Sequence, residues 1–125
     1  MYIPKPLEDK VTIPQLVKLK QQGEKFACLT AYDYSFARLV EDCGVEVVLV
    51  GDSLGMVIQG HDTTIPVTLA DIEYHGKAVA AGLDNAMLML DMPFGSLNSP
   101  QQALDNASEL LKRTQAQVVK LEGGE

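Results

Sequence analysis

Hydrophobic residues gather in short runs along the chain, and the segments between the runs have the spacing of amphipathic helices. The runs predict strands within residues 25–32, 45–50, 85–91 and 116–125. The run VEVVLV at 45–50 is rich in β-branched residues and shows no clean alternation of apolar and polar positions. That pattern is typical of a parallel strand that is covered on both faces.

Four segments carry helix-start and helix-stop residues, and they predict helices at 12–23, 33–44, 68–82 and 99–113. Thr68 and Asp71 have the spacing of a capping box, and Ser99 precedes a proline that suits the first helical turn. In the second segment, residues at i, i+3, i+4 and i+7 form an apolar stripe: Phe36, Leu39, Val40 and Cys43. Residues 51–67 are predicted to form a long loop.

The alternation of strands and helices predicts an α/β fold with a parallel sheet and right-handed crossovers. Local pattern does not decide between a doubly wound sheet and a (β/α)8 barrel, and neither a GxGxxG fingerprint nor a P-loop occurs in the sequence. The fourth strand ends at Gly-Gly-Glu with no helix after it, which leaves a parallel strand half-covered. Because a barrel usually needs about 250 residues, we expect residues 1–125 to be the N-terminal part of a single (β/α)8 TIM barrel, truncated after four strands.

The composition favours a soluble, cytoplasmic globular protein. A chain of 125 residues with 46% hydrophobic residues is long enough to bury a core. Its net charge of −7 argues against nucleic acid or an anionic membrane as a partner, and no apolar run is long enough to span a bilayer. Cys28 and Cys43 lie in apolar segments without metal-binding spacing, which predicts buried free thiols.

Acidic residues follow three consecutive predicted strands at their carboxyl ends: Asp52, Asp91 and Glu122. In a parallel sheet these ends lie on one side, and neighbouring strands are about 4.8 Å apart, so the three carboxylates can converge. In a barrel this is the catalytic face. Converging carboxylates repel one another unless a cation offsets them, and hard oxygen ligands suit Mg²⁺. Lys120 lies on the same face of its strand as Glu122, where it can bind an anionic substrate.

Each of these acids has a simpler interpretation as a turn residue or as the cap of the next helix. A shared site is favoured only because an acid recurs at the end of three consecutive predicted strands. Asp33 follows the first strand in the same way and is interpreted as a helix cap. Glu73 and Lys77 are four residues apart on one predicted helix and are interpreted as a surface pair. The same holds for Asp71 and His75.

Several longer motifs occur along the chain in the order TAYDYSFA, LVGDSLGM, IQGHDTTIPVT, MLDMPFGS and VVKLEGG. In this order they resemble the ketopantoate hydroxymethyltransferase family, and the similarity runs from near Thr12 to the last residue. The resemblance implies a (β/α)8 barrel of the phosphoenolpyruvate mutase and isocitrate lyase type, in a homo-oligomer that is often a decamer. It also implies a role in pantothenate and coenzyme A biosynthesis.

The resemblance implies a role for each strand-end residue. Asp52, Asp91 and Glu122 surround Mg²⁺, directly or through water, while the 2-oxo acid is contacted by Asp52, Ser53, Asp91 and Lys120. The implied reaction moves a one-carbon unit from 5,10-methylenetetrahydrofolate to 3-methyl-2-oxobutanoate and gives 2-dehydropantoate. Mg²⁺ chelates the carboxylate and keto oxygens of the 2-oxo acid and stabilises the enolate that forms when C3 loses its proton.

The sequence departs from the family pattern at the general base. In the family this base is a glutamate on a later barrel strand, and Glu125, in the loop after the fourth strand, is not assigned that role. We therefore expect this chain alone to be inactive or nearly so. One alternative is a non-catalytic fragment that survives only as an oligomer or as a partner of other chains.

The tetrapeptide GDSL at residues 51–54 points to a second enzyme class, the GDSL serine esterases, with Ser53 as the nucleophile. That mechanism needs a histidine to activate Ser53, which the esterases supply in a DxxH motif near the C-terminus. This chain offers only DIEYH, Asp71 to His75, with one residue too many and inside a predicted helix. The transferase interpretation is therefore favoured.

Overall fold

The computed structural model describes residues 5–123, and Glu125 lies outside them. Its sheet has four strands: β1 (Cys28–Thr30), β2 (Val47–Val50), β3 (Met87–Asp91) and β4 (Val118–Lys120). Every neighbouring pair is parallel, and the strands lie side by side in the order of the sequence. The predicted parallel α/β fold is confirmed, and each strand falls inside its predicted range. The complete eight-stranded barrel stays a prediction.

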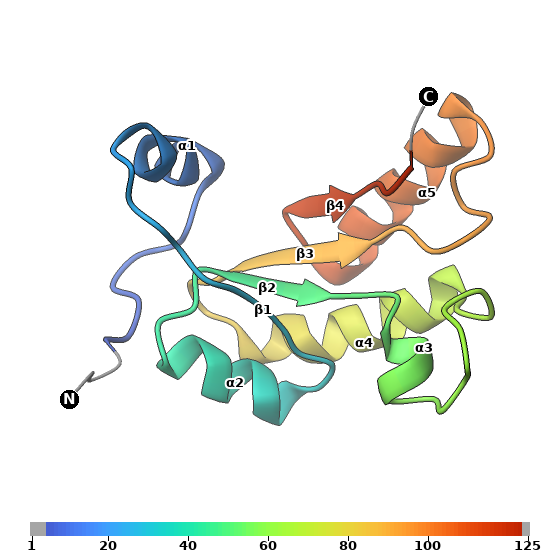
Figure 1. Ribbon diagram of the computed structural model, residues 1–125, viewed down its shortest axis with the longest axis horizontal. Coiled ribbons are helices and arrows are strands. Elements are labelled where there is room, and N and C mark those ends of the chain that lie inside the picture. The colour runs from blue at the N-terminus through green and yellow to red at the C-terminus, as the bar shows by residue number, and fades with distance from the viewer. Residues whose placement is uncertain (1–4, 124–125) are drawn as a thin grey trace.

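Within the described residues the helices are α1 (Ile13–Gln21), α2 (Tyr34–Asp42), α3 (Leu54–Val57), α4 (Leu69–Gly82) and α5 (Pro100–Thr114). Four of them were predicted, whereas α3 lies in the segment that was predicted to be a loop. Figure 1 shows α2 and α4 on one side of the sheet and α1 on the other, with the strands pointing towards α3. None of the helices in residues 5–123 is long and apolar enough to cross a membrane.

The long helices begin at the predicted capping residues. The side chains of Thr12, Asp33, Thr68 and Ser99 each accept a hydrogen bond from a backbone N–H of the first turn. Thr68 and Asp71 complete the predicted capping box, with both reciprocal bonds present. These bonds satisfy N–H groups that have no partner inside the helix. The role of Asp33 as a cap is confirmed by its 2.7 Å bond from the Phe36 N–H.

Side chains of the strands alternate between two apolar layers. The main core lies between the sheet and the helices α2, α4 and α5, and it includes Val48, Val50, Leu88, Leu90, Ala37, Ile72, Val79 and Leu110. On the opposite face, Val47 and Met87 pack with Val11, and Leu16 of α1 borders this smaller cluster. Burial on both faces explains why the second strand shows no alternation in its sequence.

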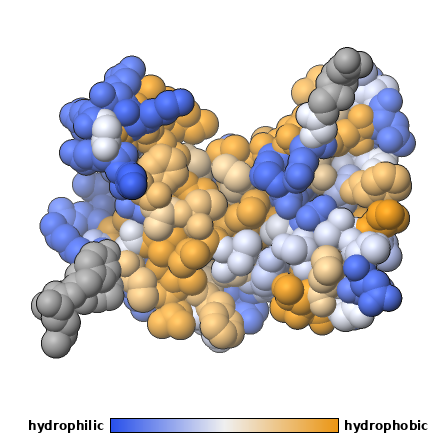
Figure 2. All heavy atoms as spheres, viewed as in Figure 1, coloured by the Kyte–Doolittle hydropathy of each residue, from blue (hydrophilic) through white to orange (hydrophobic). Residues whose placement is uncertain are grey.

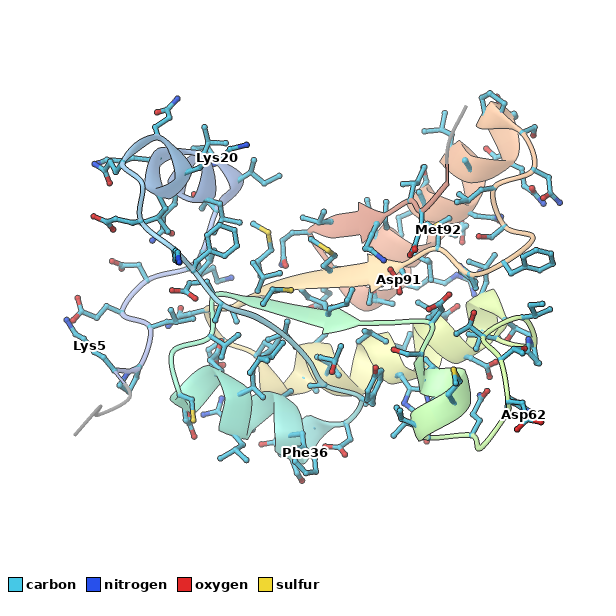
Figure 3. The ribbon with its side chains drawn as sticks, in the orientation of Figure 1. Lys5, Lys20, Phe36, Asp62, Asp91 and Met92 are labelled. Carbon is cyan, nitrogen blue, oxygen red and sulfur yellow. The ribbon has the colours of Figure 1, made fainter. Side chains whose placement is uncertain are left out.

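The apolar stripe of α2 is only partly covered. Val40 packs against the core, whereas Phe36 and Leu39 are 60% and 56% exposed. The buried face of the helix instead holds Ala37 and Glu41. Hydrophobic residues spread over this part of the surface in Figure 2, and Figure 3 shows Phe36 on the side of α2 that faces away from the sheet.

The predicted burial of the two cysteines is wrong. Cys28 and Cys43 are both free thiols, as expected, but both are exposed. Cys28 belongs to β1, an edge strand whose residues are all exposed. Cys43 is the C-cap of α2, at the end of the partly covered stripe. Apolar neighbours in the sequence therefore do not bury these thiols: one lies on an edge strand and the other at a helix end, and the described residues cover neither.

Candidate active site

The predicted site residues lie at the carboxyl ends of the strands. β3 ends at Asp91 and β4 ends at Lys120, while Asp52 and Ser53 follow shortly after β2. Because the strands are parallel, these residues reach the same edge of the sheet. Figure 3 shows Asp91 at the end of β3, between the ends of β2 and β4.

Asp91 is the centre of the site. It is only 5% exposed, and both of its carboxylate oxygens accept hydrogen bonds. Oδ2 accepts from the backbone N–H of Asp52 at 2.9 Å, and Oδ1 accepts from Nζ of Lys120 at 3.0 Å. A buried carboxylate requires such partners, since burial without them is costly. Asp91 therefore ties the segment after β2, and also strand β4, to the end of β3.

Lys120 links two of the predicted acids. Its Nζ also donates a hydrogen bond to Oε2 of Glu122 at 2.8 Å, so one ammonium group contacts both Asp91 and Glu122. Both hydrogen bonds raise the pKa of Lys120 and keep it charged, and the bond to Glu122 has the larger effect. The same contact lowers the pKa of Glu122. The two side chains meet as predicted, although Glu122 lies two residues beyond the end of β4.

Asp52 is less well compensated than the other acids. Burial raises the pKa of its carboxyl group, and the negative charge of nearby Asp91 raises it further. The side chain of Thr64, in the segment that leads to α4, acts in the opposite direction, as does the charge of Lys120. The site therefore brings together two carboxylates, on Asp52 and Asp91, that repel each other.

The charged residues fit Mg²⁺ in part. Within residues 5–123, no three His, Cys, Asp or Glu side chains lie close enough together to hold a metal ion, and Glu122 is engaged by Lys120. Asp52 and Asp91 offer hard carboxylate oxygens whose charges repel, and Mg²⁺ commonly uses one or two carboxylates, with water or substrate completing its coordination. The ligand roles assigned to Asp52, Asp91 and Glu122 stay predictions.

The hydroxyl group of Ser53 contacts a tyrosine that the strand-end pattern did not include. Its Oγ lies 2.9 Å from the hydroxyl oxygen of Tyr32, just after β1. Among the described residues, neither His61 nor His75 hydrogen-bonds to Ser53, and Nδ1 of His75 lies 2.8 Å from the carbonyl oxygen of Tyr32 instead. A serine without a histidine partner lacks the activation that the GDSL esterase mechanism requires.

The predicted surface pair of Asp71 and His75 is wrong. Asp71 accepts a hydrogen bond from the backbone N–H of Thr68 in the capping box, whereas Nδ1 of His75 hydrogen-bonds to the carbonyl oxygen of Tyr32. The pair of Glu73 and Lys77 is confirmed by a distance of 2.7 Å.

Tyr32 and Thr64 are thus site residues that the sequence analysis missed. A signal existed for Tyr32, because aligning the first strand by its carboxyl end, like the other three, puts Tyr32 at the same edge as Asp52. Thr64, which lowers the pKa of Asp52, has no such signal, since it lies within a long connecting segment.

A charged cluster at the carboxyl ends of parallel strands is the arrangement of an α/β enzyme, whose active site lies at that edge of the sheet. Comparison with known proteins identifies the family. The profile of ketopantoate hydroxymethyltransferase matches residues 10–125. The chain belongs to this family of transferases.

Individual relatives carry the same name. The chain is 52% identical to the 3-methyl-2-oxobutanoate hydroxymethyltransferase of Magnetococcus marinus over 120 residues, which are 95% of the chain and 45% of the relative. It is 58% identical to the protein of that name from Erwinia tasmaniensis, over 90% of the chain and 42% of the relative. It is 55% identical to the protein of that name from Shewanella sp. (strain MR-4), over 92% of the chain and 43% of the relative. The chain spans less than half the length of these relatives.

Proposed function

We propose that the strand-end site binds 3-methyl-2-oxobutanoate and that the whole protein transfers to it a hydroxymethyl group from 5,10-methylenetetrahydrofolate. The products are 2-dehydropantoate, a precursor of pantothenate, and tetrahydrofolate. The observation that carries the proposal is the contact of Asp91 with both Asp52 and Lys120, at the ends of parallel strands, in a member of this family.

The charges of the site suit a 2-oxo acid. Lys120 is held in its cationic form and can bind the carboxylate of the substrate, and Ser53 supplies a hydroxyl donor. We expect Asp52 and Asp91 to hold Mg²⁺, with Glu122 contributing directly or through water. Bound Mg²⁺ supplies Lewis-acid polarisation of the keto oxygen beside the carbon that loses its proton.

The reaction also needs a general base, and no residue of this chain is assigned that role. The C3–H bond of the 2-oxo acid is replaced by a bond to the methylene carbon of the folate, and water supplies the new hydroxyl oxygen. The C3 proton leaves to a general base, which the family resemblance puts on a barrel strand later than β4. We therefore propose that residues 1–125 bind the 2-oxo acid without turning it over.

Titration calorimetry of the 125-residue chain with 3-methyl-2-oxobutanoate tests the binding proposal. We expect binding in Mg²⁺ that is lost in EDTA, and an affinity that falls about tenfold or more in Asp91→Asn, because that change removes a charge from the centre of the site. Asp42→Asn is the matched control, since the Asp42 side chain is 66% exposed on α2. Equal affinity in Mg²⁺, in EDTA and in Asp91→Asn would overturn the proposal.

Tetrahydrofolate release tests the proposal on turnover. The chain is incubated with both substrates and Mg²⁺, and no release above the uncatalysed rate is expected. Release at an enzymatic rate by residues 1–125 alone would show that these residues include the base.

The partners of the whole protein are proposed from the resemblance alone. They are the 2-oxo acid, the folate and further copies of the same subunit, as in the homo-oligomer of the family, with neither nucleic acid nor a membrane among them. Sedimentation velocity of the chain over a range of concentrations measures its self-association. A monomer at every concentration would contradict association through these residues.

A further inference from the structure

Tyr32 connects three elements at the edge of the site. Its hydroxyl oxygen lies 2.9 Å from Oγ of Ser53, beside α3, and its carbonyl oxygen lies 2.8 Å from Nδ1 of His75 on α4. Tyr32 itself lies between β1 and α2 and is partly buried. A helix thus anchors the backbone of this residue, while its side chain presents a hydroxyl group to Ser53.

Ser53 does not take the usual role of a serine at the start of a helix. It is the N-cap of α3, but its side chain makes no capping hydrogen bond. Serine is common at this position because its hydroxyl oxygen usually accepts a bond from the first turn. Here the hydroxyl group is directed at Tyr32 instead. The N–H groups of Leu54 and Gly55 donate instead to the carbonyl oxygens of Gly51 and Asp52, so α3 does not need the Ser53 hydroxyl as a cap.

The space around Gly51 shows that Tyr32 borders the charged cluster. A Cβ atom on Gly51 would lie 3.1 Å from Oγ of Ser53, 3.4 Å from Oδ2 of Asp91 and 3.7 Å from the hydroxyl oxygen of Tyr32. These three polar groups surround one small volume next to the residue that follows β2. Tyr32 is thus adjacent to the centre of the site, although it comes from the edge strand.

The chemistry of the groups fixes the direction of one of these hydrogen bonds, and the proposed ligand fixes the direction of the other. A carbonyl oxygen only accepts, so Nδ1 of His75 carries the proton that binds Tyr32, whether the ring is neutral or charged. The oxygens of a 2-oxo acid also only accept, so Ser53 donates its one hydroxyl proton to the ligand when it binds one. The hydroxyl group of Tyr32 must then donate to Oγ of Ser53.

We propose that Tyr32 is a positioning residue that holds the hydroxyl group of Ser53 in one orientation for binding the 2-oxo acid, and that His75 holds Tyr32 in place from α4. The ligand in this statement rests on the proposed function. The orientation of Ser53 does not, because it is a property of the free protein.

Nuclear magnetic resonance of the ligand-free chain tests the positioning. Three-bond couplings from the Hβ protons of Ser53 report its χ1 angle. We expect one rotamer in the wild type and rotamer averaging in Tyr32→Phe and His75→Leu. His75→Asn keeps an N–H donor near the place of Nδ1 and should restore the single rotamer. Tyr34→Phe is the matched control, since Tyr34 is 54% exposed and lies two positions away.

Two results of this measurement would overturn the proposal. One is a single Ser53 rotamer in Tyr32→Phe, and the other is an averaged rotamer in the wild type. If His75→Leu and His75→Asn behaved alike, the part assigned to His75 would be wrong. Urea unfolding of each variant shows that the couplings come from folded protein.

Ligand affinity supplies a second test, with a double-mutant cycle. In Mg²⁺, Tyr32→Phe and Ser53→Ala are each expected to weaken binding of 3-methyl-2-oxobutanoate about 3- to 10-fold, and the double variant no further than the weaker single variant. Multiplying effects would show that Tyr32 does not act through Ser53. A wild-type chain that binds no 2-oxo acid would contradict the proposed function, while the couplings of Ser53 would still decide the positioning.

Discussion

The ammonium group of Lys120 lies 3.0 Å from Oδ1 of Asp91 and 2.8 Å from Oε2 of Glu122. One cation thus joins the last residue of β3 to the edge strand β4 at the end of the sheet where the site lies. The Asp91 side chain is almost completely buried, whereas that of Lys120 is 39% exposed. The contact therefore has a structural role in addition to any role in substrate binding.

Replacing Lys120 with Met is expected to lower the free energy of unfolding by about 1–2 kcal/mol, because Asp91 is left buried without its cation. The loss is smaller than for a fully buried pair, since water reaches Lys120. Urea unfolding measures the change. Lys112→Met, at an exposed position of α5, should leave the midpoint unchanged. An unchanged midpoint in Lys120→Met would show that the pair does not stabilise the fold.

Glu41, on α2, is a second buried acid, and it holds the segment that leads into β3. It is only 6% exposed, and its carboxylate accepts three backbone hydrogen bonds at the entry to that strand. The donors are the N–H groups of Asp84 at 2.8 Å, Asn85 at 2.6 Å and Ala86 at 2.6 Å. Glu41 thus attaches α2 to the turn between α4 and β3.

Glu41→Gln is expected to lower the free energy of unfolding by about 2–3 kcal/mol. An amide keeps one acceptor oxygen and turns an NH₂ group towards backbone N–H groups that then lack a partner. Thermal or urea unfolding measures the loss. Asp42→Asn, the next residue on the exposed side of α2, should change stability by much less. Equal effects of the two variants would contradict the role given to Glu41.

Features that depend on neighbouring residues were readable from the sequence. The capping box of Thr68 and Asp71, and the start of α5 at Ser99, are decided by bonds that span a single helical turn. The apolar run that forms β2 is equally local. Asp52, Asp91 and Lys120 were found because one regularity, the carboxyl end of each parallel strand, converts sequence position into spatial position.

Contacts between distant residues could not be predicted from the sequence. Strand alignment could have placed Tyr32 at the edge of the site, but it does not show that the Tyr32 hydroxyl group contacts Ser53, 21 positions away, or that its carbonyl oxygen contacts His75, 43 positions away. α3 was not predicted because a helix of four residues is too short to show an amphipathic pattern. The exposure of Cys43 depends on which elements cover α2, and no local pattern around a cysteine contains that information.

The capping box at the start of α4 predicts a pH dependence. Hydrogen bonds from Thr68, above all from its backbone N–H, lower the pKa of Asp71. An acid with a pKa lowered by folding stabilises the fold above its unfolded pKa, and this contribution is lost as the pH falls through the folded value. We expect Asp71→Asn to lower the free energy of unfolding by about 0.5–1 kcal/mol at neutral pH.

The difference between the wild type and Asp71→Asn should shrink as the pH falls below the unfolded pKa of about 3.9. It should vanish only below the lowered pKa of the folded state, where the carboxyl group is protonated in both states. Urea unfolding at several pH values measures it. A difference that stays constant with pH would mean that Asp71 acts through its shape alone.

Gly51 provides a way to disturb the site without disturbing the core. Its φ is outside the left-handed region, so alanine can adopt this backbone, but the added Cβ would press on Ser53 Oγ at 3.1 Å. Oγ of Ser53 must then shift by a few tenths of an ångström, which disturbs its contact with Tyr32. We expect Gly51→Ala to weaken binding of the 2-oxo acid about tenfold, with a loss of stability below about 1 kcal/mol.

Gly23→Ala is the matched comparison, because it is expected to lower stability without changing the site. Gly23 has a φ of +70° and nothing within 4 Å of an added Cβ, so alanine there costs about 1 kcal/mol in backbone strain and leaves the site intact. Calorimetric titration and urea unfolding of both variants should therefore give opposite patterns. If Gly51→Ala lost stability and kept its affinity, the site would tolerate movement of Ser53, and the close packing around Gly51 would serve the fold alone.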